Sequence, residues 1–391
     1  MSPDELRASL SLASVFALRL FGMFIILPVF ALFTENRPGW NLTLAGIALG
    51  IYGLVQAILQ IPFGWLSDRH GRKPVIYAGL AVMAAGSFVC AIAESPWVMI
   101  AGRALQGAGA ISAAVIALAA DLTRESQRTK TMAIIGSTIG AAFALSFVAA
   151  PFLSRAIGVP GIFALTGALA IAAMAVMRFV VPDAPAVARA AGAPSFLAVL
   201  RDRELARLNV GIFVLHAVLM AMFVVVPVSM VRAGMPAADH WWVYLATVMA
   251  GFVLMLPGVV GRAAAHEKPV FLVAIAVVSA SMLLLALGLG SLAAIVAALV
   301  IFFAGFNVLE AKLPALVSRT APREARGAAT GVYSSVQFLG TFAGAAVGGA
   351  LAQHAGFVAV LGACLAAMLA WLAVAWNMNE LMPRATPAAG N

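Results

Sequence analysis

Charged residues are scarce in this chain, because only 10% of its 391 residues are Asp, Glu, Lys or Arg. A water-soluble domain carries about 25% charged residues, since its surface faces water. The shortage extends along the whole sequence, and it excludes soluble, disordered and nucleic-acid-binding proteins despite a net charge of +9. We therefore expect no nucleic-acid partner, and most of the protein surface should face lipid.

Cysteine is also scarce. Cys90 and Cys364 each lie in an apolar run, far apart in the sequence. Two such residues make neither a disulfide framework nor a metal-binding spacing, so we interpret them as small core side chains. No metal or other cofactor is expected.

What the chain has in excess is apolar sequence, with 63% hydrophobic residues. A membrane-spanning helix needs about 20 such residues. The runs are continuously apolar, without the alternation typical of a β-barrel, so they predict helices. Twelve spans are expected, near residues 11–34, 42–65, 74–93, 97–120, 130–154, 159–181, 206–232, 238–260, 269–288, 291–315, 327–351 and 356–378.

The basic residues are distributed unevenly over the two sides of this arrangement. Nineteen of the 24 fall at the termini and on the loops of the same side, and only Arg37, Arg155 and Arg232 fall on the opposite side. Cytoplasmic loops are enriched in Lys and Arg. The count places both termini in the cytoplasm and predicts a multi-pass protein of a bacterial inner membrane.

The longest stretch between spans, residues 182–205, divides the chain into two groups of six. Pro62 and the run Lys73-Pro74-Val75 recur 195 residues later, as Pro257 and Lys268-Pro269-Val270. We therefore predict an all-α membrane protein of two pseudo-symmetric six-helix bundles, residues 1–181 and 206–391. The linker of residues 182–205 should carry a short helix on the membrane surface.

The loop between the second and third spans reads Gly64-Trp-Leu-Ser-Asp68-Arg69-His-Gly71-Arg72-Lys73. It resembles the signature G-x-L-a-D-R-x-G-R-K of the major facilitator superfamily at every defining position. The resemblance implies two six-helix bundles that rock about a central cavity, and a charged latch that includes Asp121 after the fourth span. The residues it assigns to the latch are Gly64, Asp68, Arg69, Gly71, Arg72 and Asp121. The alternative, a basic tight turn, explains the glycine and the basic residues but not Asp68 at the end of an apolar helix.

A second signature, R-x-x-Q-G-x-G, is present in the fourth span, from Arg103 to Gly109. In the superfamily it is linked to proton coupling in drug–proton antiporters. The antiporter signature of the fifth span is retained only at Pro151. Over nearly the whole chain the sequence is most similar to YajR-type proton-driven transporters. Their extra soluble C-terminal domain is not expected here, because the sequence ends just after the twelfth span.

Proton coupling needs a titratable group that can be exposed to each side in turn. Glu310 is the carboxylate well inside a predicted span, and we interpret it as the proton carrier. An ion-paired acid near a helix end is the alternative. His216 is a candidate proton relay, although a single histidine in an apolar helix is usually a core residue. Arg19 and Arg103 keep their protons at physiological pH, so they can only influence a neighbour.

Polar and aromatic residues inside the spans are candidates for lining the substrate cavity, although core packing explains each of them as well. These candidates are Phe24, Tyr52, Gln56, Asn307, Tyr333 and Gln337. Glycines at helical spacing, among them Gly46, Gly136 and Gly344, are interpreted as sites of close helix packing. Pro28 should bend the first span, because it lacks a backbone N–H.

These features predict a monomeric secondary transporter that exports small lipophilic compounds in exchange for protons. Its partners are the lipid bilayer, a small-molecule substrate and protons, and the proton gradient is its energy source. A superfamily transporter for a specific metabolite or sugar, not necessarily an exporter, is the alternative. We expect no enzyme, because the spans lack the Ser–His, paired Asp or paired His arrangements that intramembrane proteolysis or haem ligation requires.

Overall fold

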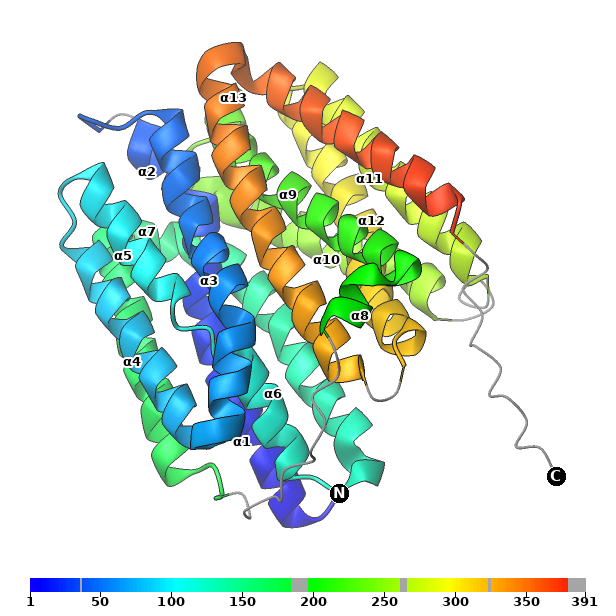
Figure 1. Cartoon of the computed structure of the whole chain (residues 1–391). Helices are drawn as coiled ribbons and strands as arrows, with labels where there is room; N and C mark the ends of the chain where they lie inside the picture. Colours follow the sequence, from blue (N-terminus) through cyan, green and yellow to red (C-terminus); the bar gives the residue numbers. More distant parts are fainter. Residues whose placement is uncertain (36, 184–195, 261–265, 323–324, 379–391) are drawn as a thin grey trace.

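The structure is a computed structural model that describes residues 1–35, 37–183, 196–260, 266–322 and 325–378. These residues form helices and contain no β-strand (Figure 1). The helices are α1 (Pro3–Phe24), α2 (Leu27–Glu35), α3 (Leu42–His70), α4 (Arg72–Ala91), α5 (Pro96–Gly107), α6 (Ser112–Asp121), η1 (Glu125–Gln127), α7 (Arg128–Phe179), α8 (Phe196–Arg201), α9 (Arg203–Arg232), η2 (Ala237–Asp239), α10 (His240–Val259), α11 (Glu267–Leu287), α12 (Leu292–Thr320) and α13 (Arg326–Trp376).

Ten segments of the described chain are long and apolar enough to cross a membrane. Two of them, Glu125–Phe179 and Arg326–Trp376, are 55 and 51 residues long. A straight helix of that length would extend about 75–80 Å, more than twice the hydrocarbon thickness. Each bends at a glycine with positive φ, Gly158 at 68° and Gly356 at 82°. Figure 1 shows α13 reversing its direction at such a bend, so the ten segments accommodate the twelve predicted crossings.

The predicted bend at Pro28 is confirmed. Helix α1 ends at Phe24 and α2 begins at Leu27, which places Pro28 in the first turn of α2. Helix α1 also begins at Pro3, well before the predicted start of the first span. The Ser2 hydroxyl accepts from the Glu5 N–H, and the Glu5 carboxylate accepts from the Ser2 N–H. This reciprocal cap stabilises a helix start that the hydrophobic pattern does not reveal.

The predicted linker lies partly outside the described residues, because the structure describes nothing of 184–195. Its second part contains the short helix α8 (Phe196–Arg201). Helix α9 begins immediately afterwards at Arg203, where the Asp202 carboxylate accepts from the N–H groups of Glu204 and Leu205. The seventh span is therefore slightly longer than predicted.

Glycines bring the backbones of α3, α13 and α9 together. A β-carbon at Gly46 of α3 would overlap the carbonyl oxygen of Ala345 in α13, and one at Gly344 of α13 would overlap that of Ala217 in α9. The packing role predicted for these glycines is confirmed. For Gly136 of α7 it is wrong, because a β-carbon there would meet no atom within 4 Å.

The two ends of the molecule differ in how their helices are joined. We call the end with the N-terminus and the α3–α4 turn the proximal end, and the opposite one the distal end (Figure 1). At the distal end, Glu35 of α2 pairs with Arg232 of α9, and the Leu42 N–H donates to Gln353 of α13. Contacts there join helices α1–α7 to helices α9–α13.

At the proximal end, the ion pairs of the described residues stay within one group of helices. Arg124 pairs with Glu5 and Arg72 with Asp121, both within α1–α7 and its loops. Arg319 of α12 pairs with Glu267 of α11 at 2.7 Å. Among the ion pairs described above, the one that joins the two groups of helices, Glu35–Arg232, lies at the distal end.

Candidate functional site

The α3–α4 turn brings three of the predicted latch residues together. Gly71 connects the two helices with φ of 94°, a conformation that favours glycine. Arg72 then donates from Nε to Asp121 of α6 at 3.1 Å. One of its terminal nitrogens bonds to Asp68 and, at 2.9 Å, to the Ser67 hydroxyl. A single guanidinium therefore ties the ends of α3, α4 and α6.

Two other predicted members of the latch, Arg69 and Gly64, lie beside apolar side chains. The Arg69 guanidinium lies 5.5 Å from the ring centre of Trp65, a cation–π distance. A β-carbon at Gly64 would meet Ala113 at 3.5 Å, which is ordinary contact. Because all of the paired residues belong to α3, α4 and α6, the cluster in this conformation joins helices of the N-terminal group to one another.

A lysine of the same loop makes a contact that the sequence analysis missed. Lys73 donates to the carbonyl oxygen of Val181 at 2.8 Å and to the Asp183 carboxylate at 2.6 Å. This ammonium group lowers the pKa of Asp183 below its usual value. The contact fixes the start of α4 to the end of α7. The signal in the sequence was a basic residue in this loop and an acid just after the sixth span.

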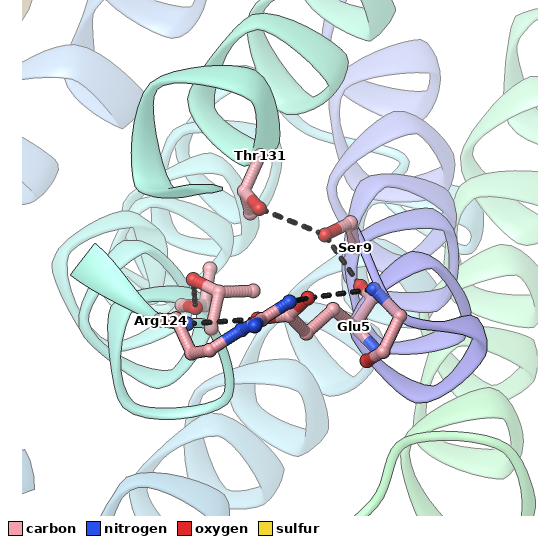
Figure 2. Close-up of polar contacts among 7 residues, drawn as sticks. Glu5, Ser9, Arg124 and Thr131 are labelled. Carbon is pink, nitrogen blue, oxygen red and sulfur yellow. Dashed lines mark hydrogen bonds and ion pairs between the residues drawn. The ribbon is translucent and has the colours of Figure 1, made fainter. Parts of the chain in front are cut away.

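A second missed cluster fixes the start of α1 (Figure 2). Arg124 donates from Nε and a terminal nitrogen to the two Glu5 oxygens, at 2.8 and 3.0 Å. This carboxylate raises the pKa of Arg124. One turn further along α1, the hydroxyls of Ser9 and Thr131 lie 2.9 Å apart. The cluster holds α1 against the α6–α7 connection. The Ser2–Glu5 spacing was its one sequence signal.

Arg19 is fully buried among neutral partners. Its terminal nitrogens donate to Ser112 of α6 at 3.1 Å, and to Tyr52 and Gln56 of α3 at 2.9 Å each. Tyr52 and Gln56, predicted to line the substrate cavity, are 4% and 0% exposed. In this conformation both side chains are buried, and they solvate the Arg19 charge, which would otherwise be costly inside a membrane.

Arg103 of α5 is bound to the backbone of α3. It donates to the carbonyl oxygens of Ala48 and Leu49 at 3.2 and 3.3 Å, and to Gln106 at 2.8 Å. Its guanidinium also lies 5.1 Å from the Tyr52 ring centre. This close approach is possible because Gly107 ends α5 against the Tyr52 backbone. Within the described chain, no ion pair joins Arg19 or Arg103 to a carboxylate.

The two predicted proton-binding residues meet in the C-terminal group of helices. Gln337 of α13 lies between them, with its amide nitrogen 2.8 Å from His216 Nε2 and 3.4 Å from a Glu310 oxygen. His216 Nε2 and the other Glu310 oxygen are 3.9 Å apart. The Glu310 side chain is 36% exposed and that of His216 is 9% exposed. The sequence proposed each residue separately and placed Gln337 in the substrate cavity.

The remaining predicted cavity residues are scattered. Phe24 packs edge-on against Phe143 of α7, with ring centres 5.2 Å apart. Tyr333 is buried and interacts with the Glu310 charge. Asn307 lies one turn before Glu310 in α12, and its amide nitrogen has no hydrogen-bond partner in the described part of the chain.

Two cavities lie where the N-terminal and C-terminal helices meet at the distal end. One, of about 370 Å³, is lined by residues of α2, α7 and α10 that include Phe33, Pro151 and His240. The other, of about 390 Å³, includes Leu42, Arg232 and Phe357. None of the six predicted substrate-cavity residues lines either of these two cavities.

The fold and these clusters define a multi-pass membrane transporter rather than an enzyme. The model of the Major Facilitator Superfamily matches residues 12–345, so the chain belongs to that superfamily. It is 43% identical over 388 residues to the inner membrane transport protein YajR of Escherichia coli (strain K12), which covers 97% of this chain and 85% of YajR.

Two further similarities are more limited. The chain is 35% identical over 128 residues to the multidrug resistance protein MdtH of Yersinia enterocolitica, which covers 31% of this chain and 32% of MdtH. It also shares its fold with an inward-facing, occupied crystal structure of a bacterial homologue of the human lysosomal transporter Spinster. That match has a TM-score of 0.76 and 13% identity, and covers 99% of this chain and 100% of the other.

Proposed function

We propose that this protein exports small lipophilic compounds across a bacterial inner membrane in exchange for protons. Two bundles, residues 1–181 and 206–391, rock about a central site in a single monomer. The proximal end, with both termini, faces the cytoplasm, where most of the basic residues then lie. The proton gradient is the energy source, and no bound cofactor is needed.

The position of Glu310 carries this proposal. Every other carboxylate in the described residues lies at a helix end or between helices, whereas Glu310 lies inside α12. Its side chain is still 36% exposed, and it adjoins His216 and Gln337. A charged carboxylate inside a membrane span is costly, so such a residue is a functional candidate by default. It can bind a proton from one side and release it to the other.

Two further observations support export of lipophilic compounds. The terminal nitrogens of Arg19 and Arg103 donate to neutral groups in this conformation, which leaves fewer donors for a sugar phosphate or other anion, although Arg19 Nε has no partner among the described residues. The relative MdtH carries the name of a multidrug resistance protein. A transporter for a specific metabolite or sugar remains the second candidate.

The test is substrate-induced proton movement in liposomes that contain the purified protein and a pH-sensitive dye. A panel of lipophilic cations, lipophilic neutral compounds and sugars is added to the unaltered protein, to Glu310→Gln and to Glu94→Gln. Glu94 is an exposed loop carboxylate and is the matched control.

We expect lipophilic compounds to move protons in the unaltered and Glu94→Gln proteins, and Glu310→Gln to lose this movement while remaining folded. A response confined to a sugar would favour the second candidate. Undiminished proton movement in Glu310→Gln would exclude Glu310 as the carrier.

A further inference from the structure

Gln337 contacts both His216 and Glu310 through one atom. Its amide nitrogen carries two hydrogens and lies 2.8 Å from His216 Nε2 and 3.4 Å from Glu310 Oε1. In this arrangement one hydrogen points to the histidine nitrogen and the other to the carboxylate. His216 Nε2 then acts as an acceptor and carries no proton.

This arrangement discriminates between the two places where a proton could bind. A proton on His216 Nε2 would face the amide N–H, so two donors would oppose each other. A proton on Glu310 creates no such conflict, because a carboxylic acid keeps a carbonyl oxygen that accepts from the amide. Gln337 therefore disfavours the proton on His216 more strongly than it disfavours the proton on Glu310.

The other ionisable groups around this site do not replace Gln337. Tyr333 of α13 is buried, and its hydroxyl has no hydrogen-bond partner among the described residues. Lys312 lies two residues further along α12, where its electrostatic neighbours are Glu267 and Arg319. The side chain that touches both His216 and Glu310 is that of Gln337.

The same turn of α13 also contacts the N-terminal helices. A β-carbon at Gly53 of α3 would lie 2.7 Å from the Phe338 carbonyl oxygen, and one at Gly50 would lie 2.9 Å from that of Phe342. On another side, Gly340 of α13 packs directly against the Phe213 backbone of α9. Helix α13 thus holds Gln337 against His216 and simultaneously forms the α3 contact between the two groups of helices.

We propose that Gln337 is a positioning residue that places the coupling proton on Glu310 and links its binding to the α3–α13 contact. This inference rests on the proposed proton coupling through Glu310. Protonation of Glu310 weakens the bond that its carboxylate accepts from Gln337, because a neutral acceptor binds an N–H less strongly than a charged one. Once its bond to Glu310 is weakened, the Gln337 amide allows α13 to shift against α3.

The first experiment measures the pH profile and the proton-to-substrate ratio in the same liposomes for Gln337→Leu. Leucine has a similar size but no hydrogen-bonding group. Gln127→Leu, a glutamine substitution in η1 outside the spans, is the matched control. We expect Gln337→Leu to lower the ratio about tenfold, and to shift the pH profile because His216 becomes free to bind a proton. Adding His216→Asn should remove that shift.

The second experiment measures how far apart α5 and α13 lie at the distal end. Spin labels are attached to cysteines introduced by Trp97→Cys and Val358→Cys, two exposed positions in these helices. Acidification should change this distance in the otherwise unaltered protein and leave it unchanged with Gln337→Leu. If Gln337 had only a structural role, the folded Gln337→Leu variant would keep the pH profile of the unaltered protein.

The outcomes separate the two proposals. If Glu310→Gln keeps full proton coupling, the proposed function fails. If Glu310→Gln abolishes coupling, but Gln337→Leu keeps the unaltered ratio, pH profile and acid-induced distance change, only the role of Gln337 is overturned.

Discussion

Glu35 and Arg232 form an ion pair of 3.1 Å that joins the end of α2 to the end of α9, 197 residues apart in sequence. The Arg232 guanidinium also lies 4.8 Å from the ring centre of Phe357 in α13. One side chain therefore connects three helices at the distal end. This end must separate if the transporter is to open there.

The first prediction concerns this ion pair. Arg232→Gln should favour opening of the distal end, because it removes both the pair and the ring contact. An exposed pair contributes about 0.2–1 kcal/mol, so the populations should shift up to about fivefold. Labelling by a thiol reagent of a cysteine introduced at Ser229, which is 2% exposed and lines the cavity beside Arg232, would measure the change. Arg37→Gln, a nearby arginine stacked on Phe33, is the control, and equal labelling of both variants would contradict the prediction.

The second prediction concerns the close contact of α3 and α13. Gly46→Leu should force the two helices apart, because its β-carbon would overlap the Ala345 carbonyl oxygen. Overpacking of this kind costs about 1–3 kcal/mol. Transport should fall, and the distal end should become more accessible.

The control for this change is Gly136→Leu in α7, where a β-carbon meets no atom within 4 Å. It should leave stability and transport nearly unchanged. If both leucine variants were equally impaired, the effect would come from adding a leucine to a spanning helix and not from the α3–α13 contact.

The third prediction concerns the charged cluster at the α3–α4 turn. Arg72→Lys should destabilise the N-terminal helices, because a single ammonium group cannot reproduce the separate bonds to Asp121, Asp68 and Ser67. The side chains are only partly buried, so we expect a loss of about 1 kcal/mol and a lower Tm in detergent. A Tm equal to that of the unaltered protein would show that one ammonium group suffices.

The fourth prediction concerns pH. Lys73 lowers the pKa of Asp183. Their contact therefore stabilises the folded protein at pH values above the usual pKa of an aspartate, and this contribution is lost as the pH falls through the lowered pKa. Lys73→Met should raise the pKa of Asp183 toward its usual value of about 3.9. Carbon NMR of the labelled carboxyl group would measure the shift. Lys268→Met, which alters the corresponding lysine in the first turn of α11, should leave the pKa of Asp183 unchanged.

Much of the fold could be predicted from the sequence, because spanning a bilayer imposes long apolar helices whose ends are marked by charge, proline and glycine. Gly158 and Gly356 divide α7 and α13 close to the predicted boundaries. The start of α1 could not be found in this way, since a polar cap at Ser2 and Glu5 defines it and hydropathy does not.

The candidate site was predicted only in part. The loop signature identified Asp68, Arg72 and Asp121, because a tight turn brings near neighbours together and the resemblance supplied the third residue. The environment of Tyr52 could not be predicted, since hydropathy does not reveal which side of a helix faces a buried arginine.

The sequence by itself determined that this chain is a helical membrane transporter with a carboxylate inside a span, because composition and local signals are properties of the chain. Only the tertiary structure decided that Gln337 lies between His216 and Glu310, and that the distal ends of the helices are joined. Those contacts link residues more than a hundred positions apart in the chain or on different helices. They depend on how the helices pack, which no local pattern specifies.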